Sequence, residues 1–355
     1  MKDNIILRLE DVTKSFGKTD VIKNVSLDIY EGEFITLLGP SGCGKTTILR
    51  MISGLERVTK GKIFIDDKDV TNVDPTKRAV NTIFQNFALF PKMTVYDNIA
   101  FGLVVAKVDK EEIKKRVTKT IKLVKLDGFE NRYPGELSGG QQQRVAIARG
   151  IIMNPKVLLL DESLCSLDLK LKKNMQIELK RIQKKLGLTF IYVTHAQDEA
   201  LSMSDRIAII NKGVIEQLGT PQEIYMNPKT VFVADFIGDA NILDATVLKK
   251  EDESIKVSLL GDVTLNIKTI DEYSKGDKVK LIIRPEDVKV SKNALNNGIK
   301  GKIVDYTFSG ESTKLIIEIP GEFNIKSSIT EEEKFKYGDD VYIKFDEKYI
   351  VSLRK

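Results

Sequence analysis

The stretch that most constrains this chain is a glycine-rich turn between an apolar run at residues 34–38 and a helix-like segment. The turn reads Gly39-Pro40-Ser41-Gly42-Cys43-Gly44-Lys45-Thr46-Thr47. Glycines allow backbone conformations that other residues avoid, so the N–H groups of such a turn can surround an anion. The positive end of the following helix adds to this attraction. The pattern therefore predicts a phosphate-binding loop, with Lys45 at the β- and γ-phosphates and Thr46 offered to Mg²⁺.

Two carboxylates, Asp161 and Glu162, follow an uncharged apolar run at residues 157–160. A strand without charge until its C-terminal tip is typical of a parallel α/β sheet, whose ligands bind at that edge. Phosphoryl transfer to water needs neutralised charge, a metal ion and a base that activates the water. We therefore expect Asp161 to hold the ion and Glu162 to act as the base. The structural alternative is a solvated pair of carboxylates at a strand end.

A third motif lies at residues 137–149. It reads Leu137-Ser138-Gly139-Gly140-Gln141-Gln142-Gln143-Arg144-Val145-Ala146-Ile147-Ala148-Arg149, with Ser138 as the expected helix N-cap. The motif resembles the signature of ATP-binding-cassette proteins, and the resemblance covers roughly residues 9–236. It implies an α/β P-loop ATPase core with antiparallel β and helical subdomains.

The resemblance also implies roles for single residues. Gln85, at a predicted strand tip, resembles the glutamine that touches Mg²⁺ or the attacking water, and His195, the only histidine, resembles the one that reaches the γ-phosphate. Phe16 matches the aromatic that stacks on adenine, although such a residue taken alone is more often a core residue beside a turn. The expected catalytic residues are Glu162, His195 and Gln85, and the expected metal ligands are Thr46, Gln85 and Asp161. The expected ATP-binding residues are Phe16, Gly39, Pro40, Ser41, Gly42, Cys43, Gly44, Lys45, Thr46, Thr47, Ser138, Gly139, Gly140 and Asp168.

The chain holds one phosphate-binding loop and one signature motif, and this count indicates how many copies form an ATP site. In the family two cassettes pair head to tail, and the signature of one copy closes over ATP on the other. The resemblance therefore implies a homodimer, with Asp168 at the contact and Ser138, Gly139 and Gly140 facing the partner's γ-phosphate. It further implies two integral-membrane permease subunits and an external solute-binding protein, with the chain peripheral on the cytoplasmic face of the cell membrane.

Three positions depart from the family pattern. The family usually has proline where this chain has Ser163, glycine or serine where it has Cys165, and aspartate where it has Ala196. The first two can loosen the turn that positions Glu162, and the third removes a carboxylate. None of them removes an expected catalytic group, so hydrolysis is still expected.

Near Gly238 the pattern changes to short alternating strands separated by turn signals, which predicts a small all-β barrel or sandwich. We place the cassette at residues 1–237, its helical subdomain at about 86–154, and a C-terminal β regulatory domain at 238–355. Residues 284–287 and the segment from Gly301 resemble the oligomer-binding-fold module of some importer ATPases. Single-stranded nucleic acid is the rival ligand for such a fold, but the aromatics are dispersed and lysines alternate with glutamates, so no nucleic acid is expected.

Composition narrows the cellular setting. Two cysteines suggest neither a disulfide framework nor a zinc site, so a reducing compartment fits. The first residues lead directly into a strand pattern, and we expect no signal peptide. No run of 18 or more apolar residues exists, so a membrane role requires a partner.

Three classes of cassette protein compete: an importer motor, a soluble cassette acting on ribosomes or DNA, and a regulator that no longer hydrolyses ATP. A soluble cassette protein usually carries two cassettes in one chain or a long coiled-coil insertion, and neither is seen here. A regulator that no longer hydrolyses ATP is expected to lack Glu162 or His195, and both are present. The single cassette and appended β module favour the importer. Residues 80–85 and 236–241 resemble importers of polyamines (spermidine and putrescine), while ferric-iron, sugar and sulfate importers are close alternatives.

Overall fold

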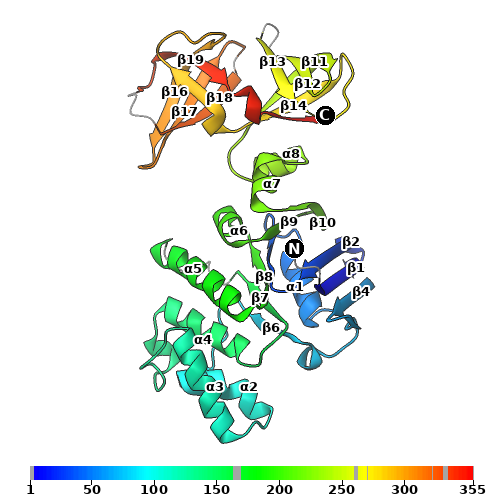
Figure 1. Ribbon diagram of the computed structural model, residues 1–355, viewed down its shortest axis with the longest axis vertical. Coiled ribbons are helices and arrows are strands. Elements are labelled where there is room, and N and C mark those ends of the chain that lie inside the picture. The colour runs from blue at the N-terminus through cyan, green and yellow to red at the C-terminus, as the bar shows by residue number, and fades with distance from the viewer. Residues whose placement is uncertain are drawn as a thin grey trace. The chain divides into compact units, whose positions relative to one another are not determined.

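The computed structural model describes residues 4–162, 169–259, 263–269, 271–321, 323–330 and 335–354. They form two compact units that divide between Pro221 and Gln222 (Figure 1). The first contains the helices and the phosphate-binding loop, and the second is mostly β. Of the described helices, none combines the length and apolar character needed to cross a bilayer.

The first unit is built on a six-stranded sheet with the order β10-β9-β3-β8-β7-β6. Its strands are β3 (Phe34–Leu38), β6 (Val80–Ile83), β7 (Val157–Asp161), β8 (Thr189–Thr194), β9 (Arg206–Asn211) and β10 (Val214–Gly219). All neighbours are parallel except β9 and β10, which form an antiparallel hairpin. Because these strands are parallel, the loop after β3 and the carboxylates after β7 share one sheet edge, as the sequence predicts.

The second sheet of this unit is antiparallel, with the order β2-β1-β4-β5. Its strands are β1 (Ile5–Phe16), β2 (Thr19–Tyr30), β4 (Lys60–Ile65) and β5 (Lys68–Asp69). One apolar core lies between the two sheets and includes Ile48 and Ile52 of α1 (Lys45–Ser53). The other face of the parallel sheet packs against helices, because successive strand residues point to opposite faces.

Those helices include the helical subdomain, seen at the bottom of Figure 1. It contains α2 (Val95–Val105), α3 (Lys110–Leu123), the short 3₁₀ turn η2 (Pro134–Glu136) and α4 (Gly139–Ile151). Asp109 caps α3 by accepting from the N–H groups of Glu111 and Glu112. Ser138 caps α4, as predicted, in a reciprocal box with Gln141. The remaining helical elements are η1 (Pro75–Lys77), α5 (Leu169–Leu186) and α6 (Gln197–Met203).

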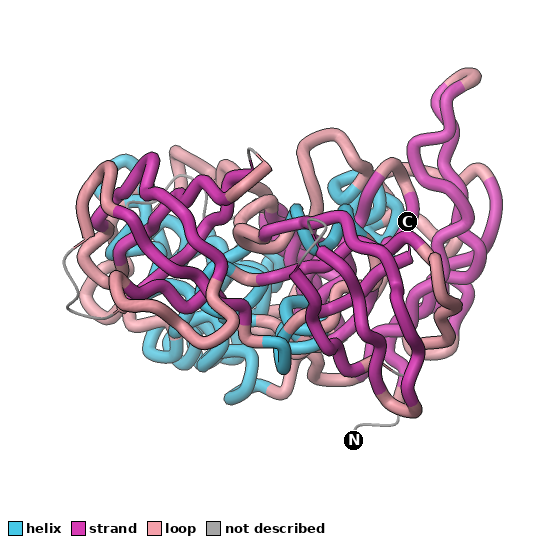
Figure 2. The backbone as a smooth tube through the Cα atoms, turned by 90° about the horizontal axis from the view of Figure 1, so that it is seen from above, coloured by secondary structure: helices cyan, strands magenta, loops and turns pink. Residues whose placement is uncertain are grey.

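The second unit holds two five-stranded antiparallel sheets, magenta in Figure 2, around one apolar core. One sheet contains β11 (Asn241–Glu251), β12 (Ser254–Leu259), β13 (Val263–Lys268), β14 (Lys278–Ile283) and β20 (Val351–Arg354). The other contains β15 (Val288–Ser291), β16 (Ile299–Phe308), β17 (Thr313–Ile319), β18 (Phe323–Ile329) and β19 (Asp340–Phe345). Short 3₁₀ turns, η3 (Pro285–Asp287) and η4 (Glu347–Tyr349), connect strands. The predicted all-β C-terminal fold is confirmed.

Two short helices, α7 (Pro221–Met226) and α8 (Val231–Phe236), belong to the second unit in space. The buried guanidinium of Arg284 explains this, because it donates to the carbonyls of Tyr225 (3.0 Å) and Ile237 (2.6 Å). It also donates to the carbonyls of Ala234 and Asp239. The compact units therefore divide at the start of α7, whereas the domain boundary after residue 237 remains a prediction.

Candidate active site

Two positions of the loop require glycine, one because neighbouring backbone atoms lie too close for a side chain and one because of its backbone conformation. A Cβ at Gly39 would lie 2.2 Å from the carbonyl oxygen of Ile210. Gly44, the N-cap of α1, has φ +108°, and a Cβ there would lie 2.4 Å from Ile22 Cδ1. At Gly39 a side chain would displace the backbone of β9, and at Gly44 the positive φ disfavours any residue with a side chain.

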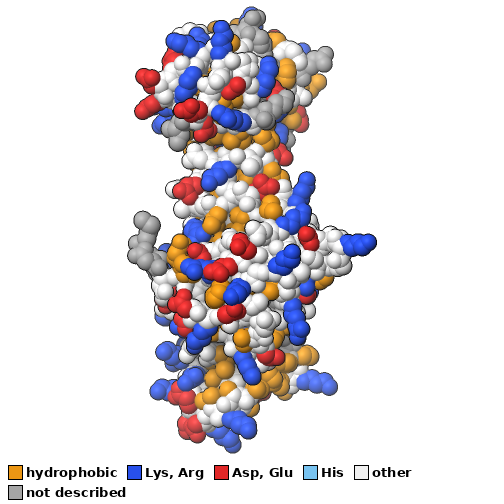
Figure 3. All heavy atoms as spheres, turned by 90° about the vertical axis from the view of Figure 1, so that its right-hand side faces the viewer, with side chains coloured by type: hydrophobic (Ala, Val, Ile, Leu, Met, Phe, Trp, Pro, Cys, Tyr) orange, Lys and Arg blue, Asp and Glu red, His pale blue; other side chains and the backbone are white. Residues whose placement is uncertain are grey.

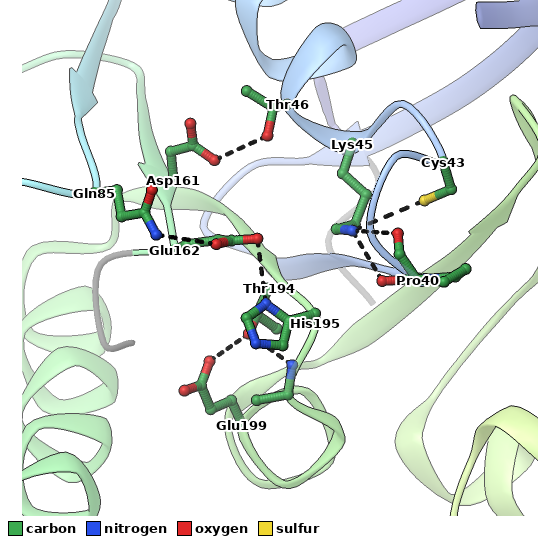
Figure 4. A network of polar contacts seen from close by, with 12 residues as sticks. Pro40, Cys43, Lys45, Thr46, Gln85, Asp161, Glu162, Thr194, His195 and Glu199 are labelled. Atoms are coloured by element: carbon green, nitrogen blue, oxygen red, sulfur yellow. Dashed lines mark hydrogen bonds and ion pairs between the residues drawn. The ribbon is translucent and has the colours of Figure 1, made fainter. Parts of the chain in front are cut away.

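Lys45 is the first residue of α1, and its side chain folds back into the loop. Its Nζ donates to the carbonyls of Gly39 at 2.8 Å and Pro40 at 2.9 Å (Figure 4). Cys43 Sγ lies 3.8 Å from the same nitrogen, and burial raises the pKa of the Cys43 thiol. The ammonium is thus held beside the predicted phosphate site, while Ser41 and Gly42 lie exposed on the turn.

Thr46 and Asp161 meet at the edge of the sheet. Thr46 Oγ1 donates to Asp161 Oδ1 at 3.3 Å. Burial raises the pKa of Asp161, and the Thr46 hydrogen bond partly opposes that change. A hydroxyl and a half-buried carboxylate side by side suit Mg²⁺, which prefers oxygen ligands and usually retains water and phosphate ligands. The chemistry of this donor pair therefore fits the expected ion.

Glu162 lies between the other two predicted catalytic residues. Gln85 Nε2 donates to Glu162 Oε2 at 3.3 Å, and His195 Nδ1 lies 3.3 Å from Glu162 Oε1 (Figure 4). The backbone of Glu162 has φ +44°, a conformation uncommon for a residue with a side chain. Its N–H donates to the Val193 carbonyl at 3.0 Å, so β8 holds the turn that aims the carboxylate. Gln85, Glu162 and His195, which are far apart in sequence, thus converge at one point.

The signature residues lie elsewhere in the same unit. Ser138 and Gly139 are exposed at the start of α4, and Gly140 packs close to Leu171 of α5. Figure 1 shows α4 among the helices of the subdomain and α1 on the far side of β7 and β8. The fold therefore separates the signature from the loop of its own chain.

The remaining predicted residues are Phe16, which the structure describes, and three that it does not describe. Phe16 ends β1 with about half of its surface exposed (49%), and Lys14 Nζ lies 4.6 Å from the centroid of its ring. A ring exposed in this way is free to stack on a base. Asp168, Ser163 and Cys165 lie outside the described residues.

Two supporting residues escaped the sequence analysis. Arg149 of α4 donates to the carbonyls of Phe87 and Ala88, both at 2.8 Å, and so holds the segment after Gln85. Glu199 of α6 is a buried carboxylate beside the His195 loop. Arg149 could have been recognised from the sequence, because it lies in the signature helix. Nothing in the sequence distinguishes Glu199 from a solvent-exposed acid.

The fold and these convergent motifs define an ATP-binding cassette, and comparison with known proteins agrees. Residues 22–164 match the family described as ABC transporter, and residues 281–353 match the TOBE domain. The chain belongs to the ABC transporter family and is an ATPase of that class.

Among its relatives is the spermidine/putrescine import ATP-binding protein PotA of Aliivibrio fischeri, which is 50% identical over 325 residues. That alignment covers 91% of this chain and 87% of the relative. PotA of Vibrio cholerae is 50% identical over 317 residues, which cover 88% of this chain and 84% of the relative.

Solved structures resemble the cassette. One is cbiO1 from Clostridium perfringens, described as part of the ABC transporter complex cbiONQ, with 30% identity and a TM-score of 0.59. The match covers 62% of this chain and 91% of cbiO1. Another is the ATP-binding cassette MJ0796, a dimer in a post-hydrolysis state bound to ADP and Pi. It is 35% identical with a TM-score of 0.54, and the match covers 61% of this chain and 98% of MJ0796.

Proposed function

We propose that this chain is the ATP-hydrolysing subunit of a membrane importer for polyamines, spermidine or putrescine. The observation that carries the ATPase mechanism is the convergence of Gln85 and His195 on Glu162, one residue beyond Asp161. The observation that favours polyamines is the 50% identity to PotA proteins over about nine-tenths of the chain.

In the proposed mechanism the loop binds the nucleotide phosphates through backbone N–H groups and the Lys45 ammonium. Thr46 and Asp161, with Gln85, hold Mg²⁺, which when bound neutralises charge on the phosphate oxygens. Glu162 accepts the proton of the attacking water as a general base. His195 lies beside that carboxylate, where its imidazole can meet the γ-phosphate.

The unit of hydrolysis is proposed to be a head-to-tail homodimer. Each chain presents Ser138 and Gly139 on an exposed helix N-terminus, where backbone N–H groups and the helix dipole favour an anion. Because this helix lies away from the loop of its own chain, a second copy must supply it. The dimeric structures of MJ0796 support the proposal.

The second unit is proposed to regulate this dimer. It contains neither histidine nor cysteine and no phosphate-binding loop. A nucleic-acid role gains little support, because Phe335 is buried in the core, and Lys314 and Lys326 both approach Asp239.

The permease subunits are proposed to dock on an apolar surface of the helical subdomain, which we call the α2 patch. It consists of Phe90, Phe101, Val104, Val105 and Met153. The rings of Phe90 and Phe101 lie 4.5 Å apart, and Val104 and Val105 are 58% and 66% exposed. Figure 3 shows apolar side chains gathered at the bottom of the face in view, where the helical subdomain lies. An exposed apolar patch of this kind marks an interaction surface.

From the sequence we expect Phe87, Leu89, Phe90 and Pro91, which follow Gln85, to supply apolar groups for docking, with a core role equally open for some of them. They fall unevenly around this patch. Phe90 belongs to it, Leu89 is half-buried, and Pro91 is exposed. Phe87 is only 5% exposed and packs in the core, so of the two roles open to it, the core role is the one found. Its backbone has φ +60°, and Arg149 donates to its carbonyl.

Val105→Asp is expected to reduce uptake to background while the isolated chain keeps its fold and its ATPase rate, because a charge in the α2 patch opposes docking of an apolar partner surface. Labelled-substrate uptake and ATPase assays measure the two properties. Val214→Asp, at a partly exposed valine of the β9–β10 hairpin, is the matched control. Normal uptake with Val105→Asp would place the permease contact elsewhere.

A strain that lacks the native gene tests the substrate. We expect the chain to restore uptake of labelled spermidine or putrescine, and the same chain with Glu162→Gln to restore none. Restored uptake of ferric iron, sulfate or a sugar instead would reject polyamines and retain the ATPase. A cytoplasmic position at the membrane is part of the proposal and is checked by fractionation of the same cells.

A further inference from the structure

Glu199 is a fully buried carboxylate that the mechanism above does not use. It is the third residue of α6, and its side chain is 0% exposed. Burial of a carboxylate is costly unless its oxygens are hydrogen-bonded or ion-paired. The residues that bind the oxygens of Glu199 therefore indicate its structural role.

Two elements, β8 and α5, supply those partners. Thr194 Oγ1 donates to Glu199 Oε2 at 2.6 Å, and the Tyr192 hydroxyl, also from β8, donates to the same oxygen. Lys172 Nζ of α5 lies 2.8 Å from Glu199 Oε1. The carboxylate thus joins α5 and α6 to the C-terminal end of β8.

The Thr194 hydroxyl extends this network around His195. While its proton is donated to Glu199, its oxygen accepts the N–H of Ala196 at 3.0 Å (Figure 4). The residues on both sides of His195 are therefore fixed by one buried charge. Ala196 is the N-cap of α6 and has no side-chain acceptor for the helix, and the Thr194 hydroxyl satisfies the N–H of Ala196 itself.

We propose that Glu199 is the positioning residue of His195, holding its loop so that the imidazole stays beside Glu162. The inference rests on the proposed role of His195 in hydrolysis. His195 itself is about half exposed, with 52% of its side chain accessible, so little packing around the ring can hold it. The order of the loop must come from its backbone, and the backbone is held through Thr194.

Glu199→Gln tests this with little change in volume. A glutamine has one acceptor oxygen and one NH₂ donor, whereas both sides of Glu199 present donors. The amide either faces Lys172 or leaves the Tyr192 and Thr194 hydroxyls without an acceptor. In either orientation the NH₂ group meets a donor, so we expect the amide to move from the position in which the carboxylate fixes the Thr194 hydroxyl, and His195 to lose its orientation.

We expect kcat for ATP hydrolysis to fall on the order of 10²-fold, as for a misplacement of about 1 Å of a reacting group, while KM and ATP affinity change little. Glu33→Gln is the matched control. Glu33 is also buried and pairs with Arg206 at 3.2 Å, but it precedes β3, at the opposite edge of the sheet. That variant is expected to lower the unfolding temperature and leave kcat unchanged.

A double-mutant cycle with His195→Ala then separates positioning from a merely structural role. If Glu199 acts through His195, Glu199→Gln has no further effect on kcat in the His195→Ala background. An equal loss on both backgrounds, or a normal kcat for Glu199→Gln, overturns the inference. A normal kcat for His195→Ala instead rejects the proposed role of His195 and, with it, the inference.

Thr194→Val tests the same inference in case the Glu199→Gln protein does not fold. It removes only the hydroxyl that links Glu199 to Ala196 and leaves the Tyr192 and Lys172 contacts in place. We expect it to reproduce the loss of kcat and the non-additivity with His195→Ala. A normal kcat with Thr194→Val contradicts the proposed route through the loop.

Discussion

Glu162→Gln is expected to lower ATP turnover by on the order of 10²–10⁴-fold while ATP remains bound, because loss of a positioned general base removes a contribution of this size. Glutamine keeps the length of the side chain, and its amide can still bond to Gln85 or His195. The change therefore removes the proton acceptor without removing the contacts that hold it. Steady-state hydrolysis and retention of labelled ATP measure the two effects.

Asp161→Asn provides the contrast to this variant. If Asp161 holds Mg²⁺ rather than the water, its amide should weaken the dependence of nucleotide binding on Mg²⁺, whereas Glu162→Gln should leave that dependence intact. Normal turnover with Glu162→Gln would show that another group is the base.

Lys45→Ala is expected to lower ATP affinity by about 10- to 100-fold, since a hydrogen bond to a charged group contributes about 1.5–3 kcal/mol. The Lys45 side chain is only 5% exposed, and the carbonyls of Gly39 and Pro40 already hold its ammonium in the loop. Little conformational entropy is therefore lost when it turns to a phosphate. The alanine variant removes the charge and leaves the N–H groups of the loop.

Titration calorimetry measures this affinity directly. Lys62→Ala, at an exposed lysine of β4, removes the same charge from the same unit and is expected to bind ATP normally. Equal affinity of the Lys45→Ala and Lys62→Ala proteins would remove Lys45 from the phosphate site.

Much of the cassette could be predicted from the sequence because its signals are local. An apolar run followed by glycines and the start of a helix predicts the loop, and the uncharged run at residues 157–160 predicts β7. Ser138 caps α4 for a reason visible in the sequence, namely a glutamine three residues later.

Features that depend on distant segments could not be predicted. The φ of +44° at Glu162 depends on a hydrogen bond to Val193, 31 residues away in sequence (193 − 162). Glu199 looks like an ordinary helix acid until β8 and α5 enclose it. The division at Pro221 depends on Arg284, whose four carbonyl contacts reach back across α7 and α8.

We propose that two copies of the chain share each ATP site, and a cross-link between copies tests this most directly. One copy carries Ser41→Cys in the exposed turn of the loop, and a differently tagged copy carries Ser138→Cys at the signature. Both also carry Glu162→Gln and lack Cys43 and Cys165. With a short bismaleimide linker, we predict a cross-link between the two copies when ATP is bound and none without nucleotide. Bound ATP with no cross-link between the copies would contradict the shared site.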